Sequence, residues 1–217
     1  MVTIMDSKAF IVSLEKNPLI SIKVIPGHFA TANAHLSHYL DVGTLKFNAL
    51  VARNVAQELA IPFLSSTLID TIVCMENTHV IGAYLAEELL REGTSVINSD
   101  GDINIVAPKH DVNGRLIFHD SEIEWITNRR ILLLVTTVSS GRTLEKALEC
   151  LDYYNGKIVG ISSLFMSSLE NREQQIQTLF TADDIPGYKT FASGECEMCS
   201  AGIKLEAIVS SDGYTKI

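Results

Sequence analysis

The stretch Ile131 to Thr143, ILLLVTTVSSGRT, decides the fold. An apolar, partly β-branched run passes into a cluster of small polar residues. Beyond that cluster, apolar residues recur at helical spacing at Leu144, Ala147 and Leu151. This order predicts a buried strand, then a loop, then an amphipathic helix.

The same unit recurs on both sides of this stretch. Residues 68–75, LIDTIVCM, form a short apolar run that precedes a helical pattern from Val80 to Leu89. Residues 157–165, KIVGISSLF, follow the turn signal Asn155-Gly156. Strands that are apolar throughout and alternate with helices indicate a parallel sheet covered on both faces. We therefore expect an α/β fold with a central, mainly parallel sheet flanked by helices.

The remaining segments predict additions to this core. Residues 43–60 predict one amphipathic helix with a common apolar face, made of Phe47, Leu50, Val51, Val55 and Leu59. A helix is expected near residues 7–16, and a hairpin with a mobile loop is expected around Lys109 to Arg115. We expect a single domain over residues 1–217, with an N-terminal hood at 1–42, the α/β core at 43–165 and a C-terminal extension at 166–217.

Charge and composition exclude several classes of partner. The 217 residues include 17 basic and 26 acidic side chains, which gives a net charge of −9. This charge opposes binding to nucleic acid and to membrane surfaces. A small phosphorylated ligand remains compatible, because backbone N–H groups at a helix start can hold a phosphate. No apolar run approaches the ~20 residues of a membrane span, and no secretory signal is evident, so we expect a cytoplasmic location with reduced cysteines.

Residues Ser139 to Thr143 have the features of a phosphate-binding loop. Ligands of open parallel sheets bind where the strands end. Here hydroxyl groups, a glycine and a helix start follow the strand directly, and together they provide N–H donors and the positive end of a helix dipole. The alternative is a serine that caps the helix beside a turn glycine, with no ligand involved.

In these residues the chain resembles the type I phosphoribosyltransferases, and the orotate phosphoribosyltransferases in particular. Four apolar residues from Ile131 and the loop Ser139 to Thr143 align on Gly141. Further similar segments cover roughly residues 28 to 205, and they are Gly27-His28-Phe29 with Ser37 to Asp41, Asp70 to Leu85, and Cys196-Glu-Met-Cys199 with Gly202 and Leu205.

The resemblance implies a Mg²⁺-dependent transfer of ribose 5-phosphate from phosphoribosyl pyrophosphate to a nucleobase, with pyrophosphate released. It also implies a homodimer active in nucleotide metabolism. The implied site residues are Ser139, Ser140, Gly141, Arg142 and Thr143 for the 5-phosphate, Glu76, Asn77 and Thr78 for pyrophosphate, Lys109 and Thr136 for catalysis, and Phe29 and Tyr39 for the base pocket. The alternatives are a helix start capped by Asn77 or Thr78, and a solvated basic loop around Lys109.

Two departures from the family pattern bear on catalysis. Val135 and Thr136 stand where the family has two adjacent acidic residues, which hold the ribose hydroxyls beneath the developing positive charge. Phe165 and Met166 stand where orotate enzymes have an arginine that pairs with the base carboxylate. A second hypothesis is therefore a catalytically silent protein that binds a nucleotide or phosphoribosyl pyrophosphate. A third is another α/β protein in which residues 139–143 only cap a helix.

Histidines and cysteines lie near both ends of the chain. His28, His35 and His38 show no helical ligand spacing, and they are interpreted as part of a base-pocket wall. Cys196 and Cys199 supply two of the four ligands of a structural zinc site, and neither Cys74 nor Cys150 is obviously near them. The sequence therefore predicts no metal site formed by the chain.

Overall fold

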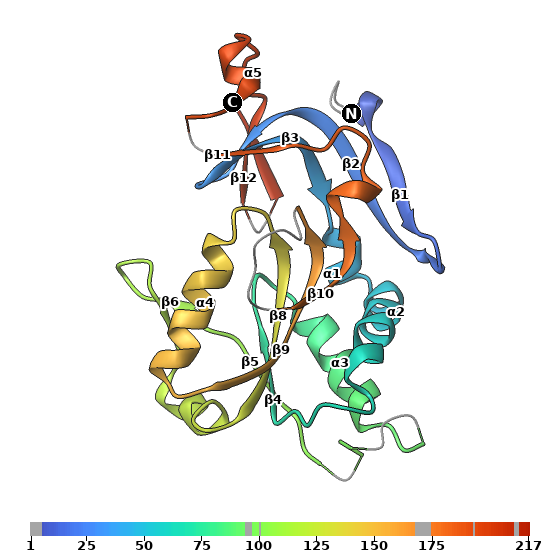
Figure 1. Cartoon of the computed structure of the whole chain (residues 1–217), viewed down its shortest axis with the longest axis vertical. Helices are drawn as coiled ribbons and strands as arrows, with labels where there is room; N and C mark the ends of the chain where they lie inside the picture. Colours follow the sequence, from blue (N-terminus) through green and yellow to red (C-terminus); the bar gives the residue numbers. More distant parts are fainter. Residues whose placement is uncertain (1–5, 94–96, 100, 168–174, 193, 211–212) are drawn as a thin grey trace.

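The computed structural model describes residues 6–93, 97–99, 101–167, 175–192, 194–210 and 213–217. These residues form a parallel sheet with helices on both faces, and a second sheet that covers one end of the first (Figure 1). The expected α/β class is therefore confirmed.

The core sheet has five parallel strands in the order β5-β4-β8-β9-β10. Its strands are β4 (Thr71–Cys74), β5 (Asn104–Val106), β8 (Arg130–Val138), β9 (Lys157–Met166) and β10 (Ile176–Thr181). Numbered along the chain, this order is 2-1-3-4-5, which is one of the two common orders of doubly wound sheets. The strands predicted around residues 68–75, 131–134 and 157–165 are all confirmed.

Alternate residues of these strands pack against helices on opposite faces. Leu132 and Leu134 belong to the apolar cluster that includes α2 (Ala49–Ala60) and α3 (His79–Leu90). Leu133 and Val135 belong to the cluster that includes α4 (Arg142–Tyr153). Burial on both faces explains why the run from residue 131 to 135 contains no polar residue.

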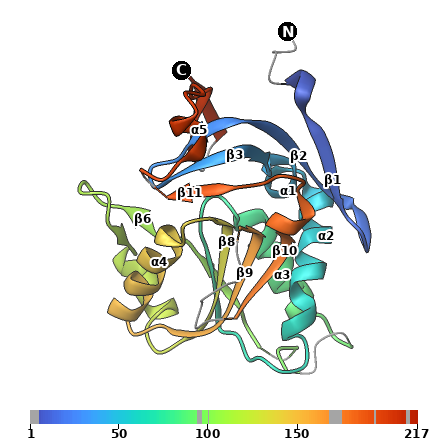
Figure 2. The ribbon, with the colours of Figure 1, turned by 45° about the horizontal axis from the view of Figure 1, so that its top comes forward.

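The second sheet, here called the hood, lies over the ends toward which the core strands point (Figures 1 and 2). It comprises β1 (Phe10–Leu14), β2 (Asn17–Ala30), β3 (Ala34–Asp41), β11 (Thr190–Ala192), β12 (Ala207–Ser210) and β13 (Gly213–Lys216). The C-terminal part of the chain thus adds β10 to the core sheet and three strands to the hood.

Two helix predictions are wrong. The helix expected near residues 7–16 is the 3₁₀ turn η1 (Asp6–Lys8) followed by strand β1, whose residues alternate in exposure. The helix expected over 43–60 is interrupted at Asn48, which separates α1 (Gly43–Phe47) from α2 and caps α2 through its side chain. Of the expected apolar face, Val55 and Leu59 are buried as predicted, whereas Phe47 and Leu50 are 67% and 64% exposed.

The expected hairpin is confirmed as β6 (Lys109–His110) and β7 (Leu116–Ile117), which pair antiparallel. It packs against α4, where the Cys150 thiol donates to the Leu116 carbonyl at 3.3 Å. The remaining short elements are η2 (Ile61–Phe63), η3 (Asp120–Trp125), η4 (Ala182–Asp184) and α5 (Glu197–Ser200).

An ion pair joins the starts of the two central strands. The Asp70 carboxylate accepts from the Arg130 backbone N–H at 2.7 Å and from Arg130 Nε at 2.9 Å. The hydrogen bonds and charge of Arg130 hold the pKa of Asp70 below its usual value.

We expect Asp70→Asn to lower the free energy of unfolding by about 1–2 kcal/mol near pH 7, because it weakens charge-assisted hydrogen bonds. A carboxyl whose pKa is depressed on folding stabilises the protein above its unfolded pKa of about 4, and this contribution is lost as the pH falls through the folded value. The difference between the two proteins should therefore shrink at acidic pH in denaturant titrations. Asp102→Asn, an exposed change before β5, serves as the control and should change nothing measurable.

Candidate functional site

The candidate site lies where the strand order changes direction. The neighbouring strands β4 and β8 continue into helices α3 and α4, which pack on opposite faces of the sheet. The loops at the carboxyl ends of two such strands diverge, and ligands of doubly wound sheets bind at this switch point. The loops here are residues 75–78 after β4 and 139–141 after β8, and both carry residues predicted for the site.

The loop after β8 has the backbone geometry that its sequence predicts. Gly141 lies in the left-handed region, with φ 85° and ψ −10°, and is the N-terminal cap residue of α4. Its carbonyl accepts the first helical hydrogen bond from Glu145 N–H at 2.9 Å. The first N–H groups of a helix have no partner within it. The twelve-residue helix α4 therefore points its positive end at this loop, beside Ser140 and Thr143.

The loop after β4 is held in a rarely adopted conformation. Glu76 and Asn77 have φ values of 53° and 65°, although neither is a glycine. Such conformations carry strain and cluster at ligand sites. Asn77 is exposed, whereas Thr78 is fully buried and its hydroxyl donates back to the Met75 carbonyl at 2.7 Å. Of the three predicted pyrophosphate residues, Thr78 thus shapes the loop through its side chain.

Glu76 joins the loop after β4 to the end of strand β8. Its Oε2 atom accepts from the Thr136 backbone N–H at 3.1 Å, and its carbonyl accepts from the Thr136 hydroxyl at 3.2 Å. Burial raises the pKa of Glu76, and hydrogen bonds from the Thr136 and Thr137 amides together with the charge of Lys46 oppose this effect. The structure therefore places one carboxylate between the ends of β4 and β8.

The position of the family's acidic pair is neutral in this structure. Val135 is 1% exposed and packs in the apolar cluster that includes α4. Thr136 is buried, and both its N–H and its hydroxyl are directed to Glu76. The carboxylate that contacts this position thus comes from the loop after β4.

Lys46 is a site residue that the sequence reasoning missed. It is 2% exposed on α1, and its Nζ atom donates to the Glu76 carbonyl at 3.1 Å. A buried ammonium group requires partners of this kind, so Lys46 fixes the loop after β4 from the hood side. Its spacing in the sequence does not distinguish it from a solvated lysine.

Tyr188, which follows η4, was also missed. Burial raises the pKa of Tyr188, and the side chains of Thr190 and of Ser139, which lies in the loop after β8, oppose this effect. Its ring stacks on His38 at a centroid distance of 6.0 Å and meets Phe165 edge-on at 5.0 Å. An aromatic group from the hood therefore adjoins the predicted 5-phosphate loop.

The predicted base-pocket residues lie within the hood. Phe29 is fully buried in a cluster with Ile25, Leu36 and Ala207. Tyr39 contacts Phe29, and burial together with the nearby Asp41 raises its pKa to about 12. Phe29 thus packs in the interior of the hood sheet, and the base-pocket role of both residues stays a prediction.

Lys109 and Arg142 are both exposed. Lys109 belongs to the hairpin that packs on α4, and its role at pyrophosphate stays a prediction. Arg142 reaches the hood, where its Nη1 atom donates to Asn33 Oδ1 at 3.4 Å. Arg142 therefore links the start of α4 to the turn between β2 and β3.

The histidines and cysteines form a separate group. His28 and His35 lie close to Cys196 and Cys199, and each residue offers one potential ligand atom to a shared point. The two pairs lie far apart in the sequence. The cysteine spacing had indicated only half of a zinc site, and the histidines had been interpreted as part of a base-pocket wall, so the sequence did not predict this group.

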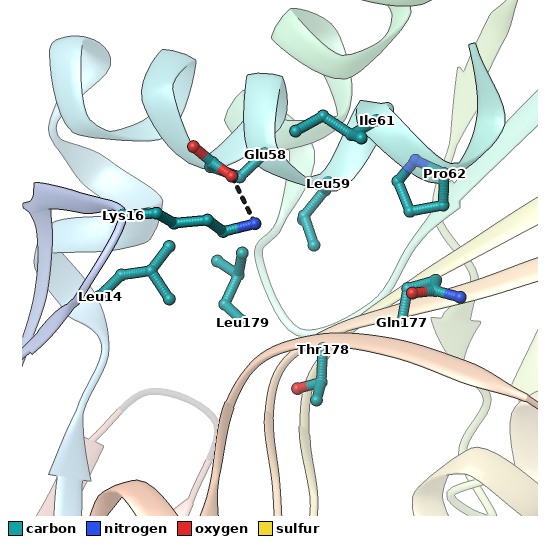
Figure 3. A pocket seen from close by; sticks show the side chains of 9 residues that line it. All are labelled: Leu14, Lys16, Glu58, Leu59, Ile61, Pro62, Gln177, Thr178 and Leu179. Carbon is teal, nitrogen blue, oxygen red and sulfur yellow. Dashed lines mark ion pairs between the residues drawn. The ribbon is translucent and has the colours of Figure 1, made fainter. Parts of the chain in front are cut away.

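A small hollow elsewhere does not compete with this site. It measures about 110 Å³ and lies between the β1–β2 hairpin, the end of α2 and β10 (Figure 3). An ion pair of 2.8 Å between Lys16 Nζ and Glu58 Oε2 crosses it. None of its lining residues belongs to the loops after β4 or β8, and small-molecule sites are usually several times larger.

Comparison with known proteins found no matching family model and no matching curated protein. Among the described residues, no helix has both the length and the apolar character needed to cross a bilayer.

Solved structures do match the chain, and among them are a UMP synthase, an adenine phosphoribosyltransferase and an orotate phosphoribosyltransferase. The UMP synthase of Leishmania donovani is 16% identical, with a TM-score of 0.49 over 69% of this chain and 31% of that one. The adenine phosphoribosyltransferase of Rhodothermus marinus is 16% identical, with a TM-score of 0.49 over 82% and 96%. The orotate phosphoribosyltransferase of Mycobacterium tuberculosis in complex with inorganic phosphate is 10% identical, with a TM-score of 0.45 over 69% and 80%. The chain thus spans about a third of the UMP synthase, and each of these is a structure to which it is similar.

Proposed function

We propose that the chain binds phosphoribosyl pyrophosphate at the switch point and transfers its ribose 5-phosphate group to a nucleobase, releasing pyrophosphate. The observation that carries the proposal is the placement of two loops side by side at the ends of β4 and β8. One contains the left-handed Gly141 before α4, and the other contains the strained residues Glu76 and Asn77 before α3. A ribose with phosphate groups at both ends matches two such loops. The resemblance of residues 70–85 and 131–143 to phosphoribosyltransferases supports it.

The reaction assigns a specific role to Glu76. The bond from C1′ to the pyrophosphate oxygen breaks and leaves its electron pair on pyrophosphate, while a nitrogen of the base bonds to C1′ and releases its proton to water. The ribose carries positive charge between these events, and a fixed carboxylate stabilises such charge. Val135 cannot do this, and Thr136 is a positioning residue that holds the Glu76 carboxylate. We assign the stabilising role to Glu76 and the neutralisation of pyrophosphate to Lys109.

The acceptor base is proposed to be neutral. The resemblance places a carboxylate-binding arginine of orotate enzymes near Phe165, and here Phe165 is fully buried against Tyr188. An orotate carboxylate needs a cationic partner in a site with little water. The aromatic ring of the half-buried Tyr188 suits a flat, uncharged base better.

The implied Mg²⁺ ion fits this chain's own donors poorly. Mg²⁺ is usually held by carboxylate oxygens and substrate phosphates. The carboxylate between the strand ends is that of Glu76, which already accepts a backbone N–H and whose pKa is raised by burial. We therefore route no step through the ion, and propose that any Mg²⁺ is carried by pyrophosphate oxygens and water.

A second candidate is a binding protein without transferase activity. The burial of Val135 and the bonding of Thr136 to Glu76 favour it, because neither residue offers a carboxylate where the resemblance places the acidic pair. The phosphate loop would then hold phosphoribosyl pyrophosphate or a nucleotide as a signal.

One experiment separates the two candidates. The purified chain is incubated with phosphoribosyl pyrophosphate, Mg²⁺ and a panel of bases that begins with orotate, and released pyrophosphate is measured. Calorimetry with phosphoribosyl pyrophosphate alone measures binding. We expect binding, and faster release with a neutral base than with orotate. Binding without release from any base establishes the second candidate, and absence of binding to phosphoribosyl pyrophosphate and ribose 5-phosphate contradicts both.

A further inference from the structure

Two histidines and two cysteines from three segments of the chain meet on the hood. His28 comes from β2, His35 from β3, and Cys196 and Cys199 from the start of α5. One atom from each of the four residues lies within 4.8 Å of the others. His28 and Cys196 are buried, His35 is half-buried and Cys199 is exposed. The group therefore lies at the surface with one well-enclosed side.

The distances fit the edges of a tetrahedron. His28 Nε2 is 3.0 Å from His35 Nδ1, 3.4 Å from Cys196 Sγ and 3.7 Å from Cys199 Sγ. Cys199 Sγ is 3.3 Å from His35 Nδ1. Zinc bound at ~2.0 Å to nitrogen and ~2.3 Å to sulfur places its ligand atoms ~3.3 to ~3.8 Å apart.

Ordinary hydrogen bonding does not account for this convergence. His28 Nδ1 lies 2.8 Å from the Ile203 carbonyl oxygen, which can only accept, so Nδ1 carries the proton. His28 Nε2 then has a single lone pair, yet three polar atoms surround it at 3.0 to 3.7 Å. A carbonyl on the distal nitrogen is also the usual device that orients a metal-binding histidine.

The local structure explains why the four side chains meet. β2 and β3 form a hairpin closed at Thr31, which donates its N–H to the Ala34 carbonyl at 2.8 Å, so His28 and His35 lie on adjacent strands. Cys196 is the N-terminal cap residue of α5, and Cys199 lies three residues later on the same side of the turn. Glu206 N–H donates to the His28 carbonyl at 2.8 Å and secures the tail beside β2.

We propose that His28 Nε2, His35 Nδ1, Cys196 Sγ and Cys199 Sγ bind one Zn²⁺ ion. Four protein ligands leave no open position, so the site is structural rather than catalytic. α5 lies on the face of the hood turned away from the core sheet (Figures 1 and 2). The ion therefore fastens the tail to the β2–β3 hairpin, and it does not depend on the proposed transferase activity.

The test begins with the full chain, purified under reducing conditions, loaded with equimolar Zn²⁺ and dialysed. Elemental analysis should give about one zinc per chain for the parent and less than about 0.2 for Cys199→Ser. Cys150→Ser is the matched control, because Cys150 lies on α4 outside the cluster, and it should retain the parent content. Co²⁺ loading should give the visible absorption bands of tetrahedral thiolate coordination in the parent and in Cys150→Ser only.

Two further measurements keep the proposal testable if Cys199→Ser folds poorly. A chelator should lower the Tm of the parent by at least ~5 °C, and Zn²⁺ but not Mg²⁺ should restore it. Thiol titration in denaturant without reductant should find all four cysteines reactive after zinc removal. Less than about 0.1 zinc per chain in the parent, or two missing thiols that show a Cys196–Cys199 disulfide, overturns the proposal.

Discussion

Replacement of Gly141 by valine will raise the Kd for phosphoribosyl pyrophosphate and for ribose 5-phosphate by ~100-fold or more, which is ~2.7 kcal/mol. Gly141 has φ 85°, a conformation that a β-branched residue adopts only at a high steric cost. The loop will leave this conformation, and the first N–H groups of α4 will no longer converge on one point. Isothermal titration calorimetry with both ligands measures the loss.

Gly93→Val is the matched control for backbone strain. Gly93 has φ 76° beyond the C-terminal end of α3, and a side chain added there meets no atom within 4 Å. It should carry a similar strain without changing the Kd. If Gly141→Val binds both ligands within ~3-fold of the parent, residues 139–143 only cap the helix.

Glu76→Gln will lower kcat by ~100-fold with little change in KM, because the neutral amide keeps the acceptor for Thr136 N–H but removes the charge that faces the transition state. The parent rate should fall as the pH is lowered, because protonation removes the Glu76 charge. Burial raises the pKa of Glu76, so this fall should begin at a higher pH than for an ordinary carboxyl. The variant has no carboxyl at position 76, so its rate should not show this fall. Steady-state kinetics across pH measure both effects, with Glu87→Gln, an exposed change on α3, as the control.

The same variant has a stability readout that needs no turnover. A carboxyl whose pKa is raised on folding stabilises the protein when it is protonated, and this contribution is lost as the pH rises through the folded pKa. Glu76→Gln should therefore gain stability relative to the parent as the pH increases. A constant difference across pH would show that Glu76 is not desolvated, and unchanged kcat in an active parent would remove it from the mechanism.

The predictability of the fold follows from burial on two faces. The run Ile131 to Leu134 has no polar residue because helices cover both sides, and that pattern is visible in the sequence. The helices predicted over residues 43–60 and 7–16 differ from the structure because these segments are covered on one side only or lie at a sheet edge. Phe47 and Leu50 are apolar yet exposed, and Phe10 to Leu14 alternate in a strand at the edge of the hood. Apolar periodicity reports which residues are apolar, but it does not predict which of them another part of the chain will cover.

The predictability of the site depends on sequence distance. The left-handed Gly141 and the helix starts are local features, and the sequence predicts them. The contacts of Lys46 with Glu76 and of Tyr188 with Ser139 join segments that only the topology brings together. The same holds for His28 and Cys199, which the β2–β3 hairpin and the tail bring together. Spacing within one short motif carries no information about residues that lie far away in the sequence.

The way the hood is assembled has a consequence for folding order. β12 pairs parallel to β2, with Ala207 opposite Phe29, so this sheet closes only when segments from opposite ends of the described chain meet. The strands β4, β5, β8 and β9 instead pair within the middle of the chain. Closing long loops slows the formation of such contacts. The core sheet can therefore form as an early folding unit. The hood, which lies over the carboxyl ends of the core strands, completes its sheet later.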